Sequence, residues 1–260
     1  MRELTLIGIG TGNPDHLTYQ GAAAINVADL ILIPRKGSDK ADLADLRRQI
    51  CDRVLTNRST EIAEFDLPRR DATDPNYRAG VEAWHEAIAA AWTEAVSTRT
   101  PTPDHVVLLI WGDPSLYDSA LRIAARLEPP PRLRMIPGIT AIQALTAAHR
   151  IPLNEIGAPF LVTTGRRLRE SGWPGEVDTL VVMLDGDCAF QVLREENVTI
   201  WWGAYLGMPE ERLFSGPLAE IGPKIVAARA AARDRHGWIM DIYLLRRTPP
   251  GGLVEERAKV

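Results

Sequence analysis

Three glycine-containing turns carry the residue types that could build a ligand site. They read GIGTGNP at 8–14, WGDPSLYD at 111–118 and PGITA at 137–141. Glycine has no Cβ, so each turn can bring main-chain groups close to a bound molecule. The sequence gives none of them a nucleophile with a paired base, since it has no Ser-His-Asp order, no Cys-His signature and five scattered histidines. Such a site holds a ligand and leaves the chemistry to it, which suits a pre-activated group donor.

The spacing of the first turn excludes the common nucleotide-binding motifs. A dinucleotide fingerprint needs glycines at relative positions 1, 3 and 6. The third place falls on Asn13 when counted from Gly8, and on Asp15 when counted from Gly10. No Gly-Lys-Ser/Thr follows, so a nucleotide-hydrolase phosphate loop is excluded too. A tight turn without a ligand remains the alternative at this point.

Buried strands and helices must position these turns. Apolar runs predict strands at 4–9, 28–33, 106–111 and 133–136. Helical patterns are found at 17–28, 40–53 and 78–98, from the end of the second turn to residue 127, and at 140–149. Residues 57–80 are polar and predict no regular element. Trp84 and Trp92 are spaced as core residues of a helix rather than as an aromatic ligand cage. The turns should therefore gather at the carboxyl edge of one parallel sheet.

Three breakers between residues 150 and 159 predict a domain boundary. Beyond it, strands are expected at 160–164, 179–184, 198–202 and 239–245, with helices near 187–196 and 217–234. The fold class is therefore α/β, with two α/β domains in tandem. We expect an N-terminal domain at 1–150, a C-terminal domain at 151–248 and a flexible tail at 249–260.

The composition is that of an ordinary soluble protein. Of 260 residues, 45% are hydrophobic and 25% are charged, and the formal net charge of −4 gives no basic footprint for nucleic acid. The two cysteines cannot form a disulfide framework, and neither a secretory signal nor a membrane-spanning run is visible. We therefore expect a cytoplasmic protein with no nucleic-acid or membrane partner.

Motif order points to a known family. The segments LIGIGTGNPDHLT, ADLILI, LLIWGDPSLYDSALRI, IPGITAIQA and IPLN occur in the order and spacing of the tetrapyrrole methylases, which the chain resembles. The resemblance implies methyl transfer from S-adenosylmethionine to a corrinoid, a cofactor and substrate cleft between the two domains, and a homodimer. Within the family, WGDPSLYDS, the loop at 34–37 and the insertion at 77–92 are most similar to the branch that methylates precorrin-5 at C-1 and releases acetate.

The resemblance also implies cofactor contacts. They fall on Gly10, Thr11, Gly12, Trp111, Gly112, Asp113, Leu116, Thr140, Ala141, Leu184, Ala204 and Tyr205. Thr11 stands where relatives usually have proline, and Leu184 stands where they often have methionine. Neither departure harms a contact made by main chain or by apolar bulk.

Substrate binding and proton transfer are less well specified. Some relatives have a basic aspartate where this chain has Pro34, so that role is not carried over. Two basic pairs are expected to bind the substrate's carboxylates, with solvated surface charge as the alternative: Arg35 with Lys36, and Arg166 with Arg167. Acetate release needs a proton carrier, for which Asp113, Tyr117, Asp118, Asp185 and Asp187 are candidates.

Among these candidates Tyr117 is preferred, followed by Asp113, although Asp113 could simply form the turn before Pro114. No metal is expected. Two alternatives stay open: a methylase of the same fold with another substrate (a different precorrin, a ribosomal RNA ribose or a protein histidine), or a non-catalytic module that binds an adenosyl ligand.

Overall fold

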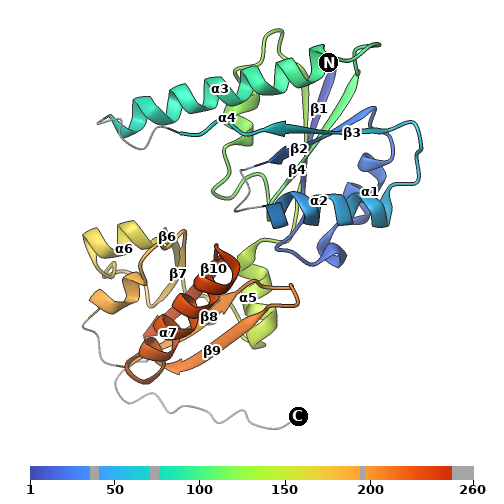
Figure 1. Ribbon diagram of the computed structural model, residues 1–260. Coiled ribbons are helices and arrows are strands. Elements are labelled where there is room, and N and C mark those ends of the chain that lie inside the picture. The colour runs from blue at the N-terminus through green and yellow to red at the C-terminus, as the bar shows by residue number, and fades with distance from the viewer. Residues whose placement is uncertain (36–40, 71–75, 194–196, 248–260) are drawn as a thin grey trace. The chain divides into compact units, whose positions relative to one another are not determined.

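A computed structural model describes residues 1–35, 41–70, 76–193 and 197–247 of the chain (Figure 1). The chain divides into two compact units, Met1–Thr140 and Ala141–Val260. Each has its own five-stranded sheet. The expected tail at 249–260 lies outside the described residues.

The first unit is built on a fully parallel sheet with strand order β3-β2-β4-β1-β5. Its strands are β1 (Glu3–Gly8), β2 (Leu30–Arg35), β3 (Glu61–Asp66), β4 (His105–Ile110) and β5 (Arg132–Ile136). The central strands are buried on both sides, which explains why they read as continuous apolar runs rather than as alternating patterns. The predicted parallel sheet is confirmed.

Helices cover both faces of this sheet. The helical elements of the unit are η1 (Pro14–His16), α1 (Tyr19–Ile25), α2 (Ala41–Val54), α3 (Tyr77–Ser97) and α4 (Ala120–Ala124). One hydrophobic cluster joins Leu4 and Leu6 of β1 to α3 and α4, and a second joins Ile7 to α1 and α2. Trp92 is buried in the first cluster and Trp84 packs against it, so the predicted core role of both is confirmed.

Two neighbouring strands separate at their carboxyl ends. β2 pairs with β4 only through Leu30–Leu32 and Val106–Leu108, although both strands continue beyond this register. The chain then leaves β2 toward α2 on one face and β4 toward α4 on the other. Such a topological switch point opens a crevice, and ligands of α/β sheets bind there.

The second unit has a mixed sheet with strand order β6-β7-β10-β8-β9. Its elements are α5 (Ala141–His149), β6 (Phe160–Thr164), α6 (Gly165–Ser171), β7 (Thr179–Met183), η3 (Ala189–Val192), β8 (Val198–Ala204), β9 (Arg212–Pro217), α7 (Leu218–His236) and β10 (Asp241–Arg247). Only β6 and β7 run parallel, and the other neighbours are antiparallel.

The unit boundary differs from the predicted boundary at residue 150. Helix α5 packs on β8, β9 and β10, and buries Leu145. Its last residue, His149, forms a 3.0 Å hydrogen bond between Nε2 and the carbonyl oxygen of Trp202. The helix therefore belongs to the second unit, which begins at Ala141. The breakers at 150–159 mark a loop inside that unit.

Three further expectations are corrected. Residues 57–80 contain the strand β3, which lies at a sheet edge and buries only Ala63 and Phe65. The edge strand β9 and the short helix α6 were not predicted. The helix expected at 187–196 is a 3-10 turn at Ala189–Val192, with residues 194–196 outside the described part.

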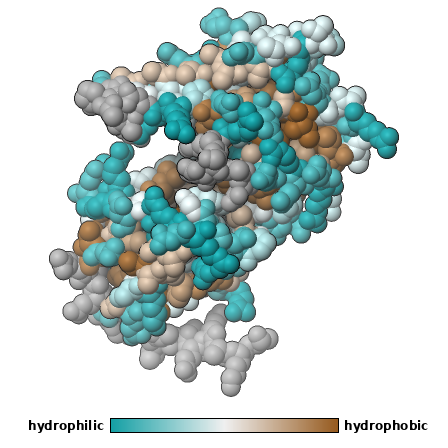
Figure 2. Space-filling view, viewed as in Figure 1, coloured by the Kyte–Doolittle hydropathy of each residue, from teal (hydrophilic) through white to brown (hydrophobic). Residues whose placement is uncertain are grey.

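No helix among the described residues is long and apolar enough to cross a bilayer. The face shown in Figure 2 is largely hydrophilic, with smaller hydrophobic areas between. Within the same residues, no group of three or more His, Cys, Asp or Glu side chains is placed to hold a metal ion.

Candidate cofactor and substrate site

The three glycine turns of the first unit pack on each other through bare backbone. A Cβ placed on Gly8 would lie 2.5 Å from the nitrogen of Gly138 and 2.7 Å from the oxygen of Gly112. A Cβ on Gly138 would collide with the same oxygen. Gly8 and Gly138 are therefore glycines because main chain meets main chain there, and not because a ligand approaches them.

Gly10 and Gly112 join the first two turns at the sheet edge. The nitrogen of Gly112 donates to the oxygen of Gly10 at 2.8 Å, and the reverse bond measures 3.3 Å. Both residues have positive φ, 79° and 64°, a conformation that favours glycine. A Cβ on Gly112 would meet nothing nearer than the Cα of Thr140 at 4.0 Å. The nitrogen and oxygen of Gly112 are thus already bonded to Gly10, and the open space at this residue lies on the side where a Cβ would be.

Asp113 ties the second turn to the third. Its Oδ1 accepts hydrogen bonds from the backbone nitrogen of Ser115 at 2.8 Å and from the Ser115 hydroxyl at 2.5 Å. Its Oδ2 accepts from the nitrogen of Gly138 at 2.9 Å. Burial raises the pKa of this carboxyl, but the three hydrogen bonds outweigh burial and leave the pKa below its ordinary value. Asp113 is thus an ionised clamp with occupied oxygens, which suits it poorly to proton transfer.

The first turn is held by its own side chains. Thr11 is buried, and its Oγ1 lies 3.3 Å from Nδ1 of His16. Gly12 is buried and adopts a φ of 129°. The side chain of Asn13 accepts from the nitrogen of Asp15 at 2.9 Å and so caps the 3-10 turn η1. These internal hydrogen bonds fix the conformation of the loop.

Three predicted site residues share an unusual backbone conformation. Tyr117, Leu184 and Tyr205 have φ values of 53°, 52° and 51°, in the left-handed region that non-glycine residues rarely adopt. Leu184 and Tyr205 directly follow β7 and β8. Strain of this kind costs about 1–3 kcal/mol and gathers at functional sites. Arg150, Cys188 and Asn197 share this conformation, so it does not by itself mark the binding site.

The environments of those residues differ. Tyr117 is 45% exposed and Leu184 is 65% exposed, so both side chains can meet a ligand. Burial raises the pKa of Tyr117, which keeps its hydroxyl protonated at neutral pH. Tyr205 is buried instead, and its hydroxyl donates to the oxygen of Trp238 at 2.5 Å. Ala204 is buried beside it.

In the second unit, Asp185 organises the loop after β7. Its Oδ2 accepts from the nitrogen of Ala189 at 2.6 Å and from the hydroxyl of Tyr243 at 2.7 Å, and its Oδ1 accepts from the nitrogen of Asp187 at 3.1 Å. A Cβ on Gly165 would collide with its carboxyl group. Asp185 is therefore a buried structural acceptor, which argues against a role as proton carrier.

The basic substrate candidates are placed as follows. Arg35 ends β2 and forms ion pairs with Glu64 at 3.5 Å and Asp66 at 3.0 Å. Lys36 lies outside the described residues. Arg166 and Arg167 are exposed in the first turn of α6, where the nitrogen of Arg167 bonds the capping hydroxyl of Thr164.

A cavity of about 190 Å³ lies where β2 and β4 separate. Pro34, Trp111, Asp118 and Arg47 line it together with apolar side chains of α3 and β3. Sequence reasoning considered Asp118 and missed Arg47. A signal was available, since Arg47 sits four residues after Leu43 and four before Cys51, which places a charge on the apolar face of its helix.

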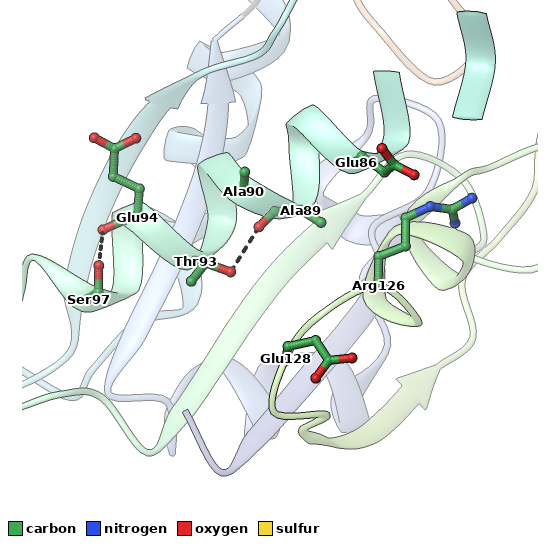
Figure 3. A pocket seen from close by; sticks show the side chains of 8 residues that line it. All are labelled: Glu86, Ala89, Ala90, Thr93, Glu94, Ser97, Arg126 and Glu128. Carbon is green, nitrogen blue, oxygen red and sulfur yellow. Dashed lines mark hydrogen bonds between the residues drawn. The ribbon is translucent and has the colours of Figure 1, made fainter. Parts of the chain in front are cut away.

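A second cavity, of about 490 Å³, lies between α3 and the segment after α4 (Figure 3). Its hydroxyls are used locally, because Thr93 donates to the oxygen of Ala89 at 3.0 Å and Ser97 donates to that of Glu94 at 3.1 Å. The remaining lining includes Glu128, which precedes β5. This cavity therefore faces the amino ends of the strands, away from the glycine turns.

Comparison with known proteins identifies the family. A family model described as Tetrapyrrole (Corrin/Porphyrin) Methylases matches residues 3–222. The chain belongs to the tetrapyrrole methylase family, and the resemblance seen in its motifs is confirmed. It is 46% identical over 251 residues to the precorrin-6A synthase (deacetylating) of Sinorhizobium sp, with 95% of this chain and 96% of that protein aligned.

Solved structures give the same result. The chain superposes with a TM-score of 0.80 on a cobalamin synthesis related protein (CobF) from Corynebacterium diphtheriae, with 38% identity, 95% of this chain and 99% of that chain covered. A uroporphyrin-III C-methyl transferase from Thermus thermophilus, solved with S-adenyl homocysteine, gives a TM-score of 0.58 at 18% identity over 94% of this chain and 97% of that one. The second likeness shows the fold alone.

Proposed function

We propose that this protein is an S-adenosylmethionine-dependent C-methyltransferase of cobalamin biosynthesis that methylates precorrin-5 at C-1 and releases acetate, giving precorrin-6A. The observation that carries the proposal is the 46% identity, across 95% of the chain, to an enzyme named precorrin-6A synthase (deacetylating). The glycine turns support it, because they lie at the carboxyl edge of a parallel sheet, where α/β folds bind ligands that bring their own reactivity.

S-adenosylmethionine supplies a methyl group already activated on a sulfonium. The proposed contacts in the first unit are Gly10, Thr11, Gly12, Trp111, Gly112, Asp113, Leu116, Thr140 and Ala141, and those in the second unit are Leu184, Ala204 and Tyr205. The open space at the Cβ position of Gly112 supports this assignment. Methyl displacement needs the nucleophile, carbon and sulfur in line, and such orientation is worth about 7–11 kcal/mol in model reactions.

Substrate binding is assigned to cations at the strand ends. A corrinoid precursor carries several carboxylates, which arginine binds in a bidentate manner. Arg35, Arg166 and Arg167 are the described candidates, and a substrate carboxylate would have to replace Glu64 or Asp66 at Arg35. Tyr117 is the proposed proton donor. Asp113 instead holds the two turns together.

The experiment incubates purified protein with methyl-labelled S-adenosylmethionine and precorrin-5. Equal amounts of methylated product and acetate are expected. Precorrin-2 is offered in parallel, because a protein named precorrin-2 C(20)-methyltransferase, from Sinorhizobium sp, is 27% identical to this chain over 57% of its length. Transfer to precorrin-2 alone would replace the proposed substrate. Cofactor binding without any transfer would leave a non-catalytic module and refute the proposal.

We further propose a homodimer that works in the cytoplasm. The family resemblance supports the dimer, and the two buried free thiols, Cys51 and Cys188, suit a reducing compartment. Light scattering should give twice the chain mass of 28.7 kDa. A value equal to the chain mass would refute the dimer.

A further inference from the structure

The cavity at the β2–β4 split contains a charge arrangement that the methyl transfer does not require. Arg47 reaches it from α2, where Nε donates to the oxygen of Leu109 at 2.9 Å and Nη1 donates to that of Leu43 at 2.9 Å. Leu109 lies one residue beyond the last β4 residue paired with β2, so its carbonyl is available. Among the described residues the hydrogen bonds of Arg47 use Nε and Nη1, and Nη2 is left for an oxygen of a ligand.

Asp118 enters the same cavity from the start of α4. Its Oδ1 accepts from the nitrogen of Ala120 at 2.6 Å. Its carboxylate interacts electrostatically with Arg47, yet no direct ion pair joins these two described side chains. Burial raises the pKa of Asp118, offset in part by Ala120 and Arg47. Burial also lowers the pKa of Arg47 to about 10, so Arg47 remains a cation at neutral pH.

Size limits what this cavity can hold. Ordinary ligand pockets measure about 300–1,000 Å³. This one, at about 190 Å³, is too small for a macrocycle or a whole cofactor. It has room for a two-carbon acid and a water molecule, since a water takes roughly 30 Å³. Its walls include Phe65, Trp84 and Ile88, which suit a methyl group.

We infer that this cavity is the subsite for the acetyl group and its product acetate, with Arg47 binding the carbonyl oxygen and Asp118 accepting the proton of the attacking water. The inference rests on the proposed function and names the place in the protein where acetate release occurs. Arg47, a cation, and Asp118, a proton acceptor, thus line one largely apolar cavity. This cavity lies at the carboxyl edge of the sheet, where the glycine turns also lie.

The step balances without another reactant. Water adds through oxygen to the acetyl carbonyl carbon, while Asp118 takes one proton. The bond between that carbon and macrocycle C-1 then breaks, and its electron pair stays on C-1. Acetic acid leaves as acetate and gives its second proton to solvent. The electron pair on C-1 becomes the nucleophile for the methyl group, so acetate release would precede methyl transfer.

Two variants separate chemistry from structure. Asp118→Asn keeps an oxygen that accepts from Ala120 and loses the proton acceptor. We expect acetate release and methyl transfer to fall together by about 100-fold or more, while S-adenosylmethionine affinity and the KM for precorrin-5 change less than threefold. The acid limb of the pH profile should also disappear. Unchanged rates in this variant would overturn the role of Asp118.

Binding of acetate tests the subsite without turnover. Carbon-13-labelled acetate is titrated against the purified protein and followed by NMR saturation transfer. Arg47→Gln should weaken acetate binding at least tenfold. Arg48→Gln serves as the matched control, because Arg48 is the next residue and pairs with Asp45 and Glu64 instead. Equal binding in both variants, or an adventitious site only, would overturn the subsite.

The outcomes distinguish the two proposals. Wild-type protein that releases no acetate from precorrin-5 would refute the proposed function, whatever the binding experiment gives. Wild-type protein that releases acetate while Asp118→Asn and Arg47→Gln behave like it would refute the subsite alone.

Discussion

The Oδ2 atom of Asp113 lies 2.9 Å from the backbone nitrogen of Gly138 and accepts its hydrogen bond. This bond joins the turn after β4 to the turn after β5, on either side of β1 in the sheet. The relative position of two predicted cofactor loops therefore depends on one carboxylate.

Replacing this clamp should loosen both loops. We expect Asp113→Asn to lower the free energy of unfolding by about 1–3 kcal/mol, because an amide leaves at least one buried donor without an acceptor. The wild-type carboxyl has a folded-state pKa below its ordinary value, so its contribution is complete above pH ~4 and disappears as pH falls further. The stability difference should therefore shrink as the pH falls below ~4 towards the folded-state pKa.

Urea denaturation at several pH values measures this difference. Asp187→Asn is the control, because that side chain is exposed and pairs only loosely with Arg169 at 3.4 Å. A constant difference between wild type and Asp113→Asn across the acid range would contradict the assigned pKa direction.

Adding one carbon at Gly8 should separate the three turns. Gly8→Ala places a Cβ 2.5 Å from the nitrogen of Gly138, and backbone cannot move aside as a flexible side chain can. We expect a loss of about 1–3 kcal/mol or more in unfolding free energy, together with weaker S-adenosylmethionine binding. Gly175→Ala, whose new carbon meets nothing within 4 Å, should change stability by less than about 0.5 kcal/mol. Equal thermal midpoints for the two variants would exclude the packing role.

The hydroxyl of Tyr117 can be removed without altering its ring. If it donates a proton during turnover, Tyr117→Phe should lower kcat by about 100-fold and leave cofactor affinity unchanged. Burial raises the pKa of the phenol, so the loss should be the same throughout the neutral range. Tyr19→Phe is the control, since Tyr19 is also exposed. Full activity in Tyr117→Phe would remove Tyr117 from the mechanism.

A buried histidine offers a gain in stability. His85 is 2% exposed, and neither ring nitrogen has a hydrogen-bond partner among the described residues. Replacing it with leucine should raise the unfolding free energy by about 1–3 kcal/mol. Burial and the positive charge of Arg126 lower its pKa, so the unfolded chain binds the proton more readily. Wild type should therefore lose stability below pH ~6.5 relative to His85→Leu, and calorimetry at pH 7.5 and 5.5 tests this.

The buried strands of the first unit were predictable because they lie inside the sheet. β1, β2 and β4 are apolar on both faces and leave a continuous signal in the sequence. β3 and β9 are edge strands in which charged and polar residues interrupt that signal, whereas the edge strands β5 and β6 keep apolar runs and were predicted. The boundary was misplaced because breakers show where a helix stops, and tertiary packing decides which unit it joins.

The candidate site was predictable where a turn has its own signature. Glycine and proline identify the three turns, but they do not tell a glycine beside open space, such as Gly112, from one packed on backbone, such as Gly8. Arg48 and Arg53 of the same helix are partly exposed and ion-paired, whereas the divergence of two strands places Arg47 at a cavity. That divergence is a property of strand register, which local sequence does not encode.

The position of β1 in its sheet has a consequence for synthesis on the ribosome. Residues 3–8 are made well before their neighbours in the sheet, which are His105–Ile110 and Arg132–Ile136. At 5–20 residues per second, an apolar strand waits roughly 6 to 25 s before its second partner exists. During that time ELTLIG must stay shielded from other nascent chains. We therefore expect expression yield to depend on translation speed and on chaperone supply.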